Sequence, residues 1–198
     1  MTGEREIDIA VIGAGPVGAA LALRLAASGR SVLLVDRAAL PPMEHPDFDG
    51  RAYAIAQGSR PLLDDAGLWD AMPFPPCPIE QIRVSDGKPG KPASPLFLHF
   101  DHRDVGDDPF GWIIEARSLR MAINRRLAEA DRLILRAPAE AAVTRENDHA
   151  IVTLADGETF RARLVVAADG RASRLRTEAR IPVTRFAYRQ SAVVCAIA

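Results

Sequence analysis

The hydrophobic pattern at the start of the chain changes from that of a strand to that of a helix and back. Residues 7–12 form a short, β-branched apolar run typical of a buried parallel strand. Over residues 16–28, alanine, leucine and valine recur at helical spacing, and Gly29 stands at the usual C-cap position. Residues 31–36 form a second apolar strand. Because parallel strands need a crossover connection, this pattern predicts a right-handed βαβ unit.

The middle of the chain is rich in proline and predicts less regular structure. Residues 38–58 look irregular. Between Pro73 and Pro95 the prolines exclude long helices and favour edge strands and turns. The elements expected in this part are a helix around 60–69, which closes near Gly67, and strands at 79–85 and 96–100.

Helical periodicity returns at residues 116–130, followed by strands. In the helix Leu119, Ile123 and Leu127 share an apolar face, and Asn124 falls outside it. Short segments joined by turn residues predict a β-meander. Its expected strands are 143–145, 151–154 and 159–162, and a separate buried strand is expected at 164–168.

Composition and charge indicate an ordinary soluble globular protein. The 198 residues are 48% hydrophobic and 26% charged, and the net charge of -1 gives no reason to expect nucleic-acid binding. Since no apolar stretch approaches the length that spans a bilayer, we expect a cytoplasmic location, with a peripheral membrane contact left open. Cys77 and Cys195 lie far apart and indicate reduced thiols. We expect no metal site, and His99 and His102 favour a solvated loop over a ligand pair.

A glycine-rich motif, Gly13-Ala14-Gly15-Pro16-Val17-Gly18, stands where the first strand gives way to the helix. In that context Gly13 permits a tight turn, Gly15 lets the backbone come close to a pyrophosphate, and Gly18 lets the helix pack against the strand. The start of the helix adds N–H groups and a positive dipole end. The motif therefore predicts a dinucleotide site, with a glycine-rich turn that binds no ligand as the alternative.

Two aspartates are expected at the ends of buried strands. Asp36 follows the glycines by about 20 residues, where it can accept hydrogen bonds from a ribose diol and would repel a 2′-phosphate. It favours the adenosine of FAD or NAD over NADP, and the alternative is an aspartate that only caps its loop. Asp169 and Gly170 open the pattern DGxxSxxR after the last buried strand. There Ser173 can cap the next helix while Arg176 reaches toward a phosphate or carboxylate.

Taken together, these motifs resemble the FAD-dependent aromatic hydroxylases of the para-hydroxybenzoate hydroxylase type. The closest resemblance is to the ubiquinone-biosynthesis hydroxylases. It covers nearly the whole chain, which corresponds to about the front half of the family. Besides the two motifs, the matching pieces are Asp49-Gly50-Arg51 with the residues up to 55, and residues 67–69, 112–119 and 188–192.

The resemblance implies an α/β fold. It consists of a Rossmann-like FAD-binding domain, with a parallel sheet and a β-meander, and part of an inserted β-sheet substrate domain. The expected bounds are 1–69 and 114–180 for the FAD-binding domain, and 70–113 and 181–198 for the incomplete substrate domain.

The resemblance also implies the cofactor contacts by position. Arg37 would lie near the adenine, and Arg51 and Arg117 near the FAD phosphates or the ribityl chain. Asp169 and Gly170 would serve both the flavin and the nicotinamide cofactor. The full set of expected cofactor contacts is Gly13, Gly15, Pro16, Val17, Gly18, Asp36, Arg37, Arg51, Arg117, Asp169 and Gly170.

In this family NAD(P)H reduces FAD and O2 supplies the oxygen added to an activated ring, so the cofactor carries the chemistry. The expected reaction is hydroxylation of a polyprenylated phenol or benzoquinol in ubiquinone biosynthesis, with contact to a membrane or a biosynthetic complex left open. The family's second flavin motif is missing before Ala198, so we expect an inactive fragment of a longer enzyme. The alternatives are another FAD enzyme of this superfold, such as a prenyl-lipid reductase or halogenase, and a non-catalytic nucleotide-binding fragment.

Overall fold

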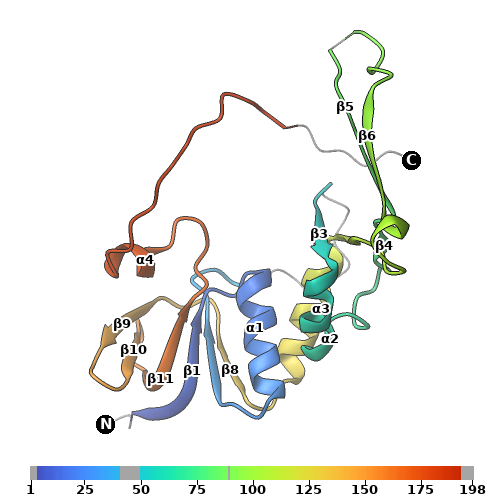
Figure 1. Cartoon of the computed structure of the whole chain (residues 1–198). Helices are drawn as coiled ribbons and strands as arrows, with labels where there is room; N and C mark the ends of the chain where they lie inside the picture. The colour runs from blue at the N-terminus through green and yellow to red at the C-terminus, as the bar shows by residue number, and fades with distance from the viewer. Residues whose placement is uncertain (1–3, 41–49, 89, 193–198) are drawn as a thin grey trace.

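The largest sheet of the protein combines parallel and antiparallel strands. The structure is a computed structural model that describes residues 4–40, 50–88 and 90–192. Its main sheet has six strands in the order β8-β2-β1-β11-β10-β9 (Figure 1). The strands are β1 (Arg5–Ile12), β2 (Val32–Val35), β8 (Leu133–Arg136), β9 (Ala141–Arg145), β10 (Ala150–Leu154) and β11 (Thr159–Ala167). The strands β8, β2, β1 and β11 are parallel, and β9 and β10 are added antiparallel. The predicted α/β fold with a parallel sheet and a β-meander is confirmed.

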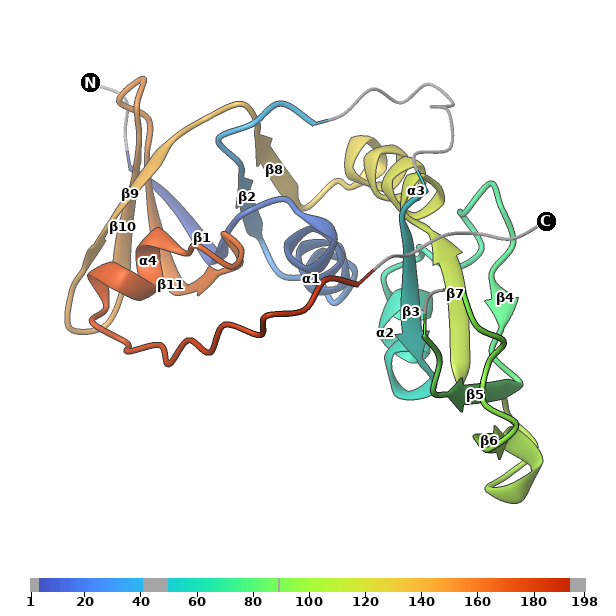
Figure 2. The ribbon, with the colours of Figure 1, turned by 90° about the horizontal axis from the view of Figure 1, so that it is seen from above.

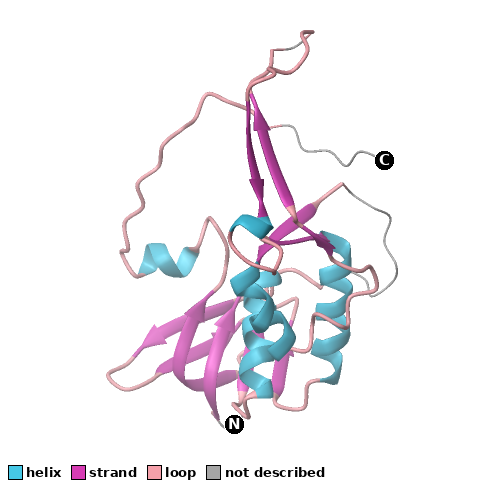
Figure 3. Cartoon of the chain, turned by 45° about the vertical axis from the view of Figure 1, so that its right-hand side comes forward, coloured by secondary structure: helices cyan, strands magenta, loops and turns pink. Residues whose placement is uncertain are grey.

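Two helices, α1 (Pro16–Ala27) and α3 (Ala116–Glu129), lie side by side against one face of this sheet (Figures 1 and 3). Leu119, Ile123 and Leu127 of α3 are buried there, as their spacing predicts. Asn124 was predicted to lie outside the buried face of this helix, but it is only 3% exposed, so that prediction is wrong. The reason is that the buried arc of α3 is wider than one stripe and also includes Ser118.

The longest strand, β11, corrects the prediction of two separate strands at 159–162 and 164–168. Its first residues pair antiparallel with β10, and almost its whole length pairs in parallel with β1. Residues 159–162 alternate between half-buried and buried positions, as in a meander strand. The second half of β11 is paired on β1 but is half-buried or exposed, with Leu164 54% exposed, so the prediction of a buried strand there is wrong. Phe160, which is fully buried, anchors the apolar cluster on the sheet face opposite the helices.

A second layer of strands lies beyond α2 (Arg60–Asp65), as Figure 2 shows from above. A three-stranded sheet has the order β3-β7-β4, and β5 and β6 form a separate antiparallel hairpin that points away from the main sheet (Figure 3). The bounds are β3 (Ala52–Ala56), β4 (Cys77–Pro78), β5 (Gln81–Ser85), β6 (Phe97–Asp101) and β7 (Gly111–Glu115), with short 3-10 turns η1 (Gln57–Ser59) and η2 (His102–Asp104).

The strand β3 overturns the prediction that residues 38–58 are irregular, although residues 41–49 of that range lie outside the described residues. Tyr53 and Ile55 alternate with alanines and pack against the helix-side core. A Cβ atom at Gly111 would lie 2.2 Å from the carbonyl oxygen of Ile55, so only glycine allows β7 to approach β3 this closely. The extended conformation of residues 52–56 thus depends on pairing with β7, which lies far along the chain.

The order of the parallel strands defines where a ligand can bind. From β1 the chain passes through α1 to β2 and through α3 to β8, always to the same side. It then returns to β11 on the other side of β1. The carboxyl ends of β1 and β11 therefore flank a topological switch point, which is where open α/β sheets bind ligands.

Candidate functional site

The glycine-rich loop lies at this switch point, held between the ends of three strands. Gly13 has a φ of +110°, and a Cβ atom there would lie 2.3 Å from the carbonyl oxygen of Ala168, just after β11. Its N–H donates to the carbonyl of Val35 at the end of β2, at 2.7 Å. Both the backbone conformation and the lack of space require glycine at this position.

The other two glycines of the motif have opposite surroundings. A Cβ atom at Gly18 would lie 2.0 Å from the carbonyl oxygen of Gly13 and 2.9 Å from the Cβ atom of Ala168, so α1 packs directly on the loop. At Gly15, the N-cap of α1, a Cβ atom would meet nothing within 4 Å. Pro16 occupies the first turn of α1, and the side chain of Val17 is exposed. The loop thus has a packed inner side and an open outer side.

Asp36 connects the end of β2 to the glycine-rich loop. Its Oδ2 atom accepts a hydrogen bond from the N–H of Ala14 at 2.7 Å, and its Oδ1 atom accepts one from Ala38 at 2.8 Å. Asp36 therefore caps its loop, as the alternative interpretation of this residue predicted. Each carboxylate oxygen has a further acceptor site, so capping leaves Asp36 able to receive a ribose hydroxyl as well. Arg37, next in the chain, is exposed.

Asp169 caps the short helix α4 (Arg174–Glu178), which begins after β11. Its Oδ2 atom accepts hydrogen bonds from the N–H groups of Arg174, at 2.8 Å, and Leu175, at 3.3 Å. Ser173 accepts a hydrogen bond from the N–H of Arg176 at 3.0 Å, which confirms the predicted cap. Since Oδ1 of Asp169 is buried and accepts no hydrogen bond from any described residue, it is an acceptor without a partner in this part of the chain.

The environment of Asp169 favours its ionised form. Partial burial acts to raise the pKa of this carboxyl, but the Ser173 hydroxyl and the N–H groups of Leu175 and Arg174 outweigh that effect, so the pKa is lowered. Gly170 follows with a φ of +86° and begins the turn. The Arg176 guanidinium donates to the carbonyl of Arg171, so in this structure it does not extend from α4 toward a carboxylate.

The two remaining arginines come from the neighbouring layer. Arg51 is exposed before β3, and its carbonyl accepts the N–H of Ala116 at 3.0 Å. Arg117 is the second residue of α3, and its Nε atom donates to Glu115 at 2.5 Å. Because α3 leads into the amino end of β8, which is parallel to β1, α3 starts at the same end as the glycine-rich loop (Figure 1). Asp49, also matched to the family, lies outside the described residues.

Several contacts at this end of the molecule have no signal in the sequence. Ala14 and Ala168 act through their backbone, which any residue carries. The hydroxyl of Ser118, in α3, is bonded to the backbone of Phe74, 44 residues away. Only the three-dimensional arrangement places these groups beside the predicted residues.

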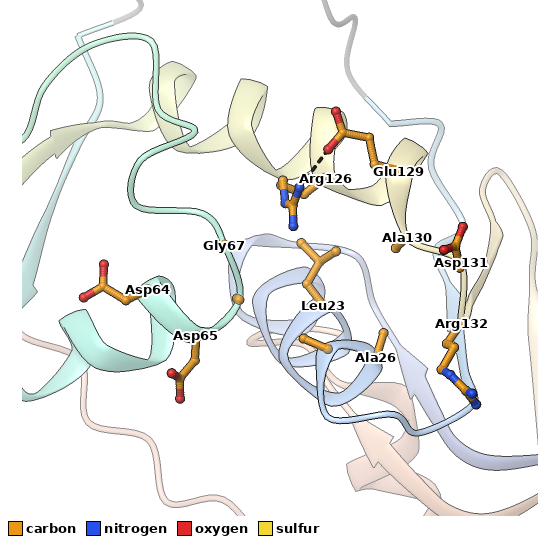
Figure 4. A pocket seen from close by; sticks show the side chains of 12 residues that line it. Leu23, Ala26, Asp64, Asp65, Gly67, Arg126, Glu129, Ala130, Asp131 and Arg132 are labelled. Carbon is orange, nitrogen blue, oxygen red and sulfur yellow. Dashed lines mark hydrogen bonds and ion pairs between the residues drawn. The ribbon is translucent and has the colours of Figure 1, made fainter.

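A cleft of about 360 Å³ lies far from the glycine-rich loop, where the ends of α1, α2 and α3 meet (Figure 4). Gly67, with a φ of +67°, faces Arg126, which forms an ion pair with Glu129 at 2.8 Å. Because α1 runs antiparallel to β1, the residues of its second half that line this cleft, such as Leu23, lie toward the amino edge of the sheet. This cleft is therefore separate from the dinucleotide site that the sequence predicts.

Neither a metal cluster nor a membrane-spanning helix occurs in residues 4–40, 50–88 and 90–192. Within those ranges no group of three or more His, Cys, Asp or Glu side chains is arranged to hold a metal ion. No helix there has the length and apolar character needed to cross a bilayer. Cys77 is an exposed free thiol, and Cys195 lies outside the described residues.

Comparison with known proteins gives a consistent set of matches. Residues 6–196 match a family model described as an FAD binding domain. Ubiquinone hydroxylase UbiL of Rhodospirillum rubrum is 40% identical over 98% of this chain and 44% of its own length. The 3-demethoxyubiquinol 3-hydroxylase of Escherichia coli is 31% identical over 96% of this chain and 48% of its own length. The chain thus spans about half the length of the curated relatives it matches.

Solved structures share the fold at lower sequence identity. The crystal structure of p-nitrophenol 4-monooxygenase PnpA from Pseudomonas putida matches with a TM-score of 0.68 and 21% identity. The match covers 87% of this chain and 43% of that protein. At this identity the likeness is one of fold.

Proposed function

The chain belongs to the FAD binding domain family, and on that premise we propose that it is the FAD-binding part of a flavin-dependent aromatic monooxygenase. The predicted resemblance to ubiquinone-biosynthesis hydroxylases is confirmed by the family match and by curated relatives that carry that name. What this chain binds, and what the whole enzyme does, are the proposals that follow.

One observation carries the assignment of the cofactor site. The glycine-rich loop, Asp36 and Asp169 follow three neighbouring strands and meet at the switch point of the sheet. The space beside Gly15 is open, and no described side chain caps the start of α1, which suits an approaching pyrophosphate. The buried Oδ1 atom of Asp169 suits a hydroxyl or N–H donor of a ligand. These residues fit FAD.

In this proposal each group has a separate role toward the cofactor. Residues 13–18 and the start of α1 bind the pyrophosphate, and Asp36 binds the adenosine ribose while it repels a 2′-phosphate. Arg37 lies beside the adenine, and Arg51 and Arg117 bind the phosphates or the ribityl chain. Bound FAD supplies the redox chemistry, with NAD(P)H as reductant and O2 as the source of the added oxygen.

The proposed domains follow from the same assignment. Residues 1–69 and 114–180 form the FAD-binding domain, and residues 70–113 and 181–198 belong to a substrate domain. The hairpin of β5 and β6, which stands apart from the main sheet, supports this division (Figure 1). Asp169 and Gly170 would be shared by the flavin and the nicotinamide cofactor.

We propose a polyprenylated phenol or benzoquinol as the substrate of the whole enzyme. Relatives described as ubiquinone hydroxylase and 3-demethoxyubiquinol 3-hydroxylase support this choice. A substrate that is mostly hydrocarbon requires an apolar path to the surface, so we also propose a peripheral contact with a membrane or with a complex of ubiquinone biosynthesis.

The test uses the full-length enzyme and its native host. We expect flavin absorption bands in the purified protein and NAD(P)H consumption that depends on a prenylated phenol. Deletion of the gene should cause an under-hydroxylated prenyl-phenol to accumulate in the quinone extract. Normal ubiquinone in a host without a redundant hydroxylase would refute the proposal and favour a reductase or halogenase. Absence of bound flavin would favour a nucleotide-binding module without catalysis.

A further inference from the structure

The first turn of α3 contains a serine that is tied to a distant loop. Ser118 is 0% exposed. Its Oγ atom accepts a hydrogen bond from the N–H of Phe74 and donates one to the carbonyl of the same residue, both at 3.1 Å. One hydroxyl thus satisfies both backbone polar groups of Phe74, which fixes this point of the loop against the helix.

The loop around Phe74 offers few backbone donors because it is rich in proline. Phe74 lies in the run Pro73-Phe74-Pro75-Pro76, and proline has no backbone N–H. The N–H of Phe74 is therefore the only backbone donor in this run, and Ser118 accepts it. The prolines also restrict the backbone on both sides of Phe74, so the bond to Ser118 helps to fix the backbone from which the ring extends.

The ring of Phe74 in turn contacts the arginine next to Ser118. The guanidinium carbon of Arg117 lies 4.3 Å from the centroid of the Phe74 ring. The Nε atom of Arg117 donates to Glu115 at 2.5 Å, and the Arg117 side chain is only 17% exposed. Arg117 is thus held on one edge by a carboxylate and on one face by an aromatic ring, which limits the directions its planar group can take.

We propose that Ser118 and Phe74 are positioning residues for FAD, which act by orienting the guanidinium of Arg117. This inference rests on the proposed function, because it takes Arg117 as a contact of the FAD phosphates or ribityl chain. A guanidinium that is already oriented loses less freedom when it forms its hydrogen bonds to the cofactor, so removing either support weakens FAD binding. Neither residue needs to touch the cofactor for this effect.

A double-mutant cycle on the full-length enzyme tests this inference, with the FAD dissociation constant measured by flavin fluorescence. Arg117→Ala should weaken FAD binding by about tenfold, and Ser118→Ala by about fivefold. In the Arg117→Ala background, Ser118→Ala should cause no further loss of affinity. Equal losses in both backgrounds would overturn the inference, because they would mean that Ser118 acts only through the stability of the fold.

Phe74 provides a second test if Ser118→Ala fails to fold. Phe74→Leu removes the aromatic face and should weaken FAD binding by about fivefold, whereas Phe74→Tyr keeps the ring and should retain the affinity. If both variants bind FAD as the wild type does, the ring has no positioning role and the inference fails.

A matched control separates positioning from general destabilisation. Val152→Ala opens a cavity in the cluster on the opposite face of the sheet and lowers stability without touching α3. It should leave the FAD dissociation constant unchanged at temperatures well below its unfolding. If the wild type binds no FAD, the proposed function fails. If it binds FAD and Arg117→Ala has no effect, this inference fails together with the proposed contact of Arg117, while the FAD site at the glycine-rich loop stands.

Discussion

Gly15 and Gly18 belong to one motif, but their surroundings give them different tasks. The backbone of Gly15 has a φ of -63°, which any residue adopts, and no atom lies near its missing side chain. Gly18 is pressed against the carbonyl of Gly13. At the scale of single residues, packing requires glycine at position 18 but not at position 15, where the proposed pyrophosphate contact is the reason for a glycine.

The first prediction is that Gly15→Ala impairs FAD binding without impairing folding. The new methyl group meets no protein atom, so the free energy of unfolding should change by less than about 1 kcal/mol. The affinity for FAD should fall by about tenfold or more, because the methyl group enters the space that the pyrophosphate needs. Denaturant unfolding of the FAD-free protein and a fluorescence titration measure the two effects. Unchanged affinity would contradict this role of Gly15.

The second prediction is the reverse result for Gly18→Ala. A Cβ atom 2.0 Å from a backbone carbonyl oxygen forces α1 away from the loop, because backbone cannot move aside as a flexible side chain can. We expect the free energy of unfolding to fall by about 1–3 kcal/mol, as in other overpacked sites. Denaturant unfolding of the FAD-free protein measures this loss. Wild-type stability in this variant would mean that the packing of α1 on the loop is looser than the structure indicates.

The third prediction concerns the two roles of Asp36. Asp36→Ala removes the acceptors for the N–H groups of Ala14 and Ala38, so stability without FAD should fall by about 1.5–3 kcal/mol. The affinity for FAD should fall as well if the carboxylate also binds the ribose. Asp107→Ala, at an exposed loop position, is the control and should change neither quantity. A loss of stability with unchanged FAD affinity would mean that Asp36 only caps its loop and does not bind the ribose.

At the scale of elements, the sequence predicted those helices and strands whose conformation depends on their own residues, and it missed those that depend on pairing with distant strands. The βαβ unit was predicted because its periodicity and its glycines agree, and the structure confirms it. The strand β8 was not predicted, because it has only four residues, Leu133–Arg136, and follows directly after a helix. An apolar run this short cannot be distinguished by its periodicity from a continuation of that helix. The strand β3 was missed because its pairing with β7, far along the chain, decides its conformation.

The fourth prediction is a pH dependence at the start of α4. Because hydrogen bonding lowers the pKa of Asp169 below its ordinary 3.8, its stabilising effect is fully present above that value and is lost as the pH falls through the lower folded pKa. The stability advantage of the wild type over Asp169→Asn should therefore shrink between about pH 5 and about pH 2. Denaturant unfolding at several pH values measures it.

The same comparison controls for other carboxylates. Hydrogen bonds from Ser31 lower the pKa of Asp8, and a hydrogen bond with His149 lowers that of Asp148, so both contribute to acid sensitivity. Since both are present in the wild type and in the variant, they cancel in the difference. A difference that stays constant across the range would mean that Asp169 is not a charged cap.

At the scale of the whole molecule, the hairpin of β5 and β6 exposes an apolar face. The cross-strand pairs Ile82–Phe100 and Val84–Leu98 lie on one face, and each of these side chains is more than 40% exposed. A two-stranded hairpin is marginal by itself in water, so such a face normally packs on further structure. This exposed face is therefore a surface on which further structure can pack, and it lies in the part of the chain that we propose as substrate domain.

The last prediction is that the 198-residue chain binds FAD much more weakly than the full-length enzyme. The proposed site would contact the cofactor along one edge of a sheet, whereas small-molecule pockets enclose most of the ligand surface. We expect a dissociation constant at least about a hundredfold higher for the chain, measured by fluorescence titration on samples whose circular dichroism shows that they are folded. The Gly15→Ala variant of the same chain is the control for specific binding and should lower the residual affinity further. A dissociation constant in the low nanomolar range would contradict the prediction, because residues 1–198 would then hold the cofactor without the rest of the enzyme.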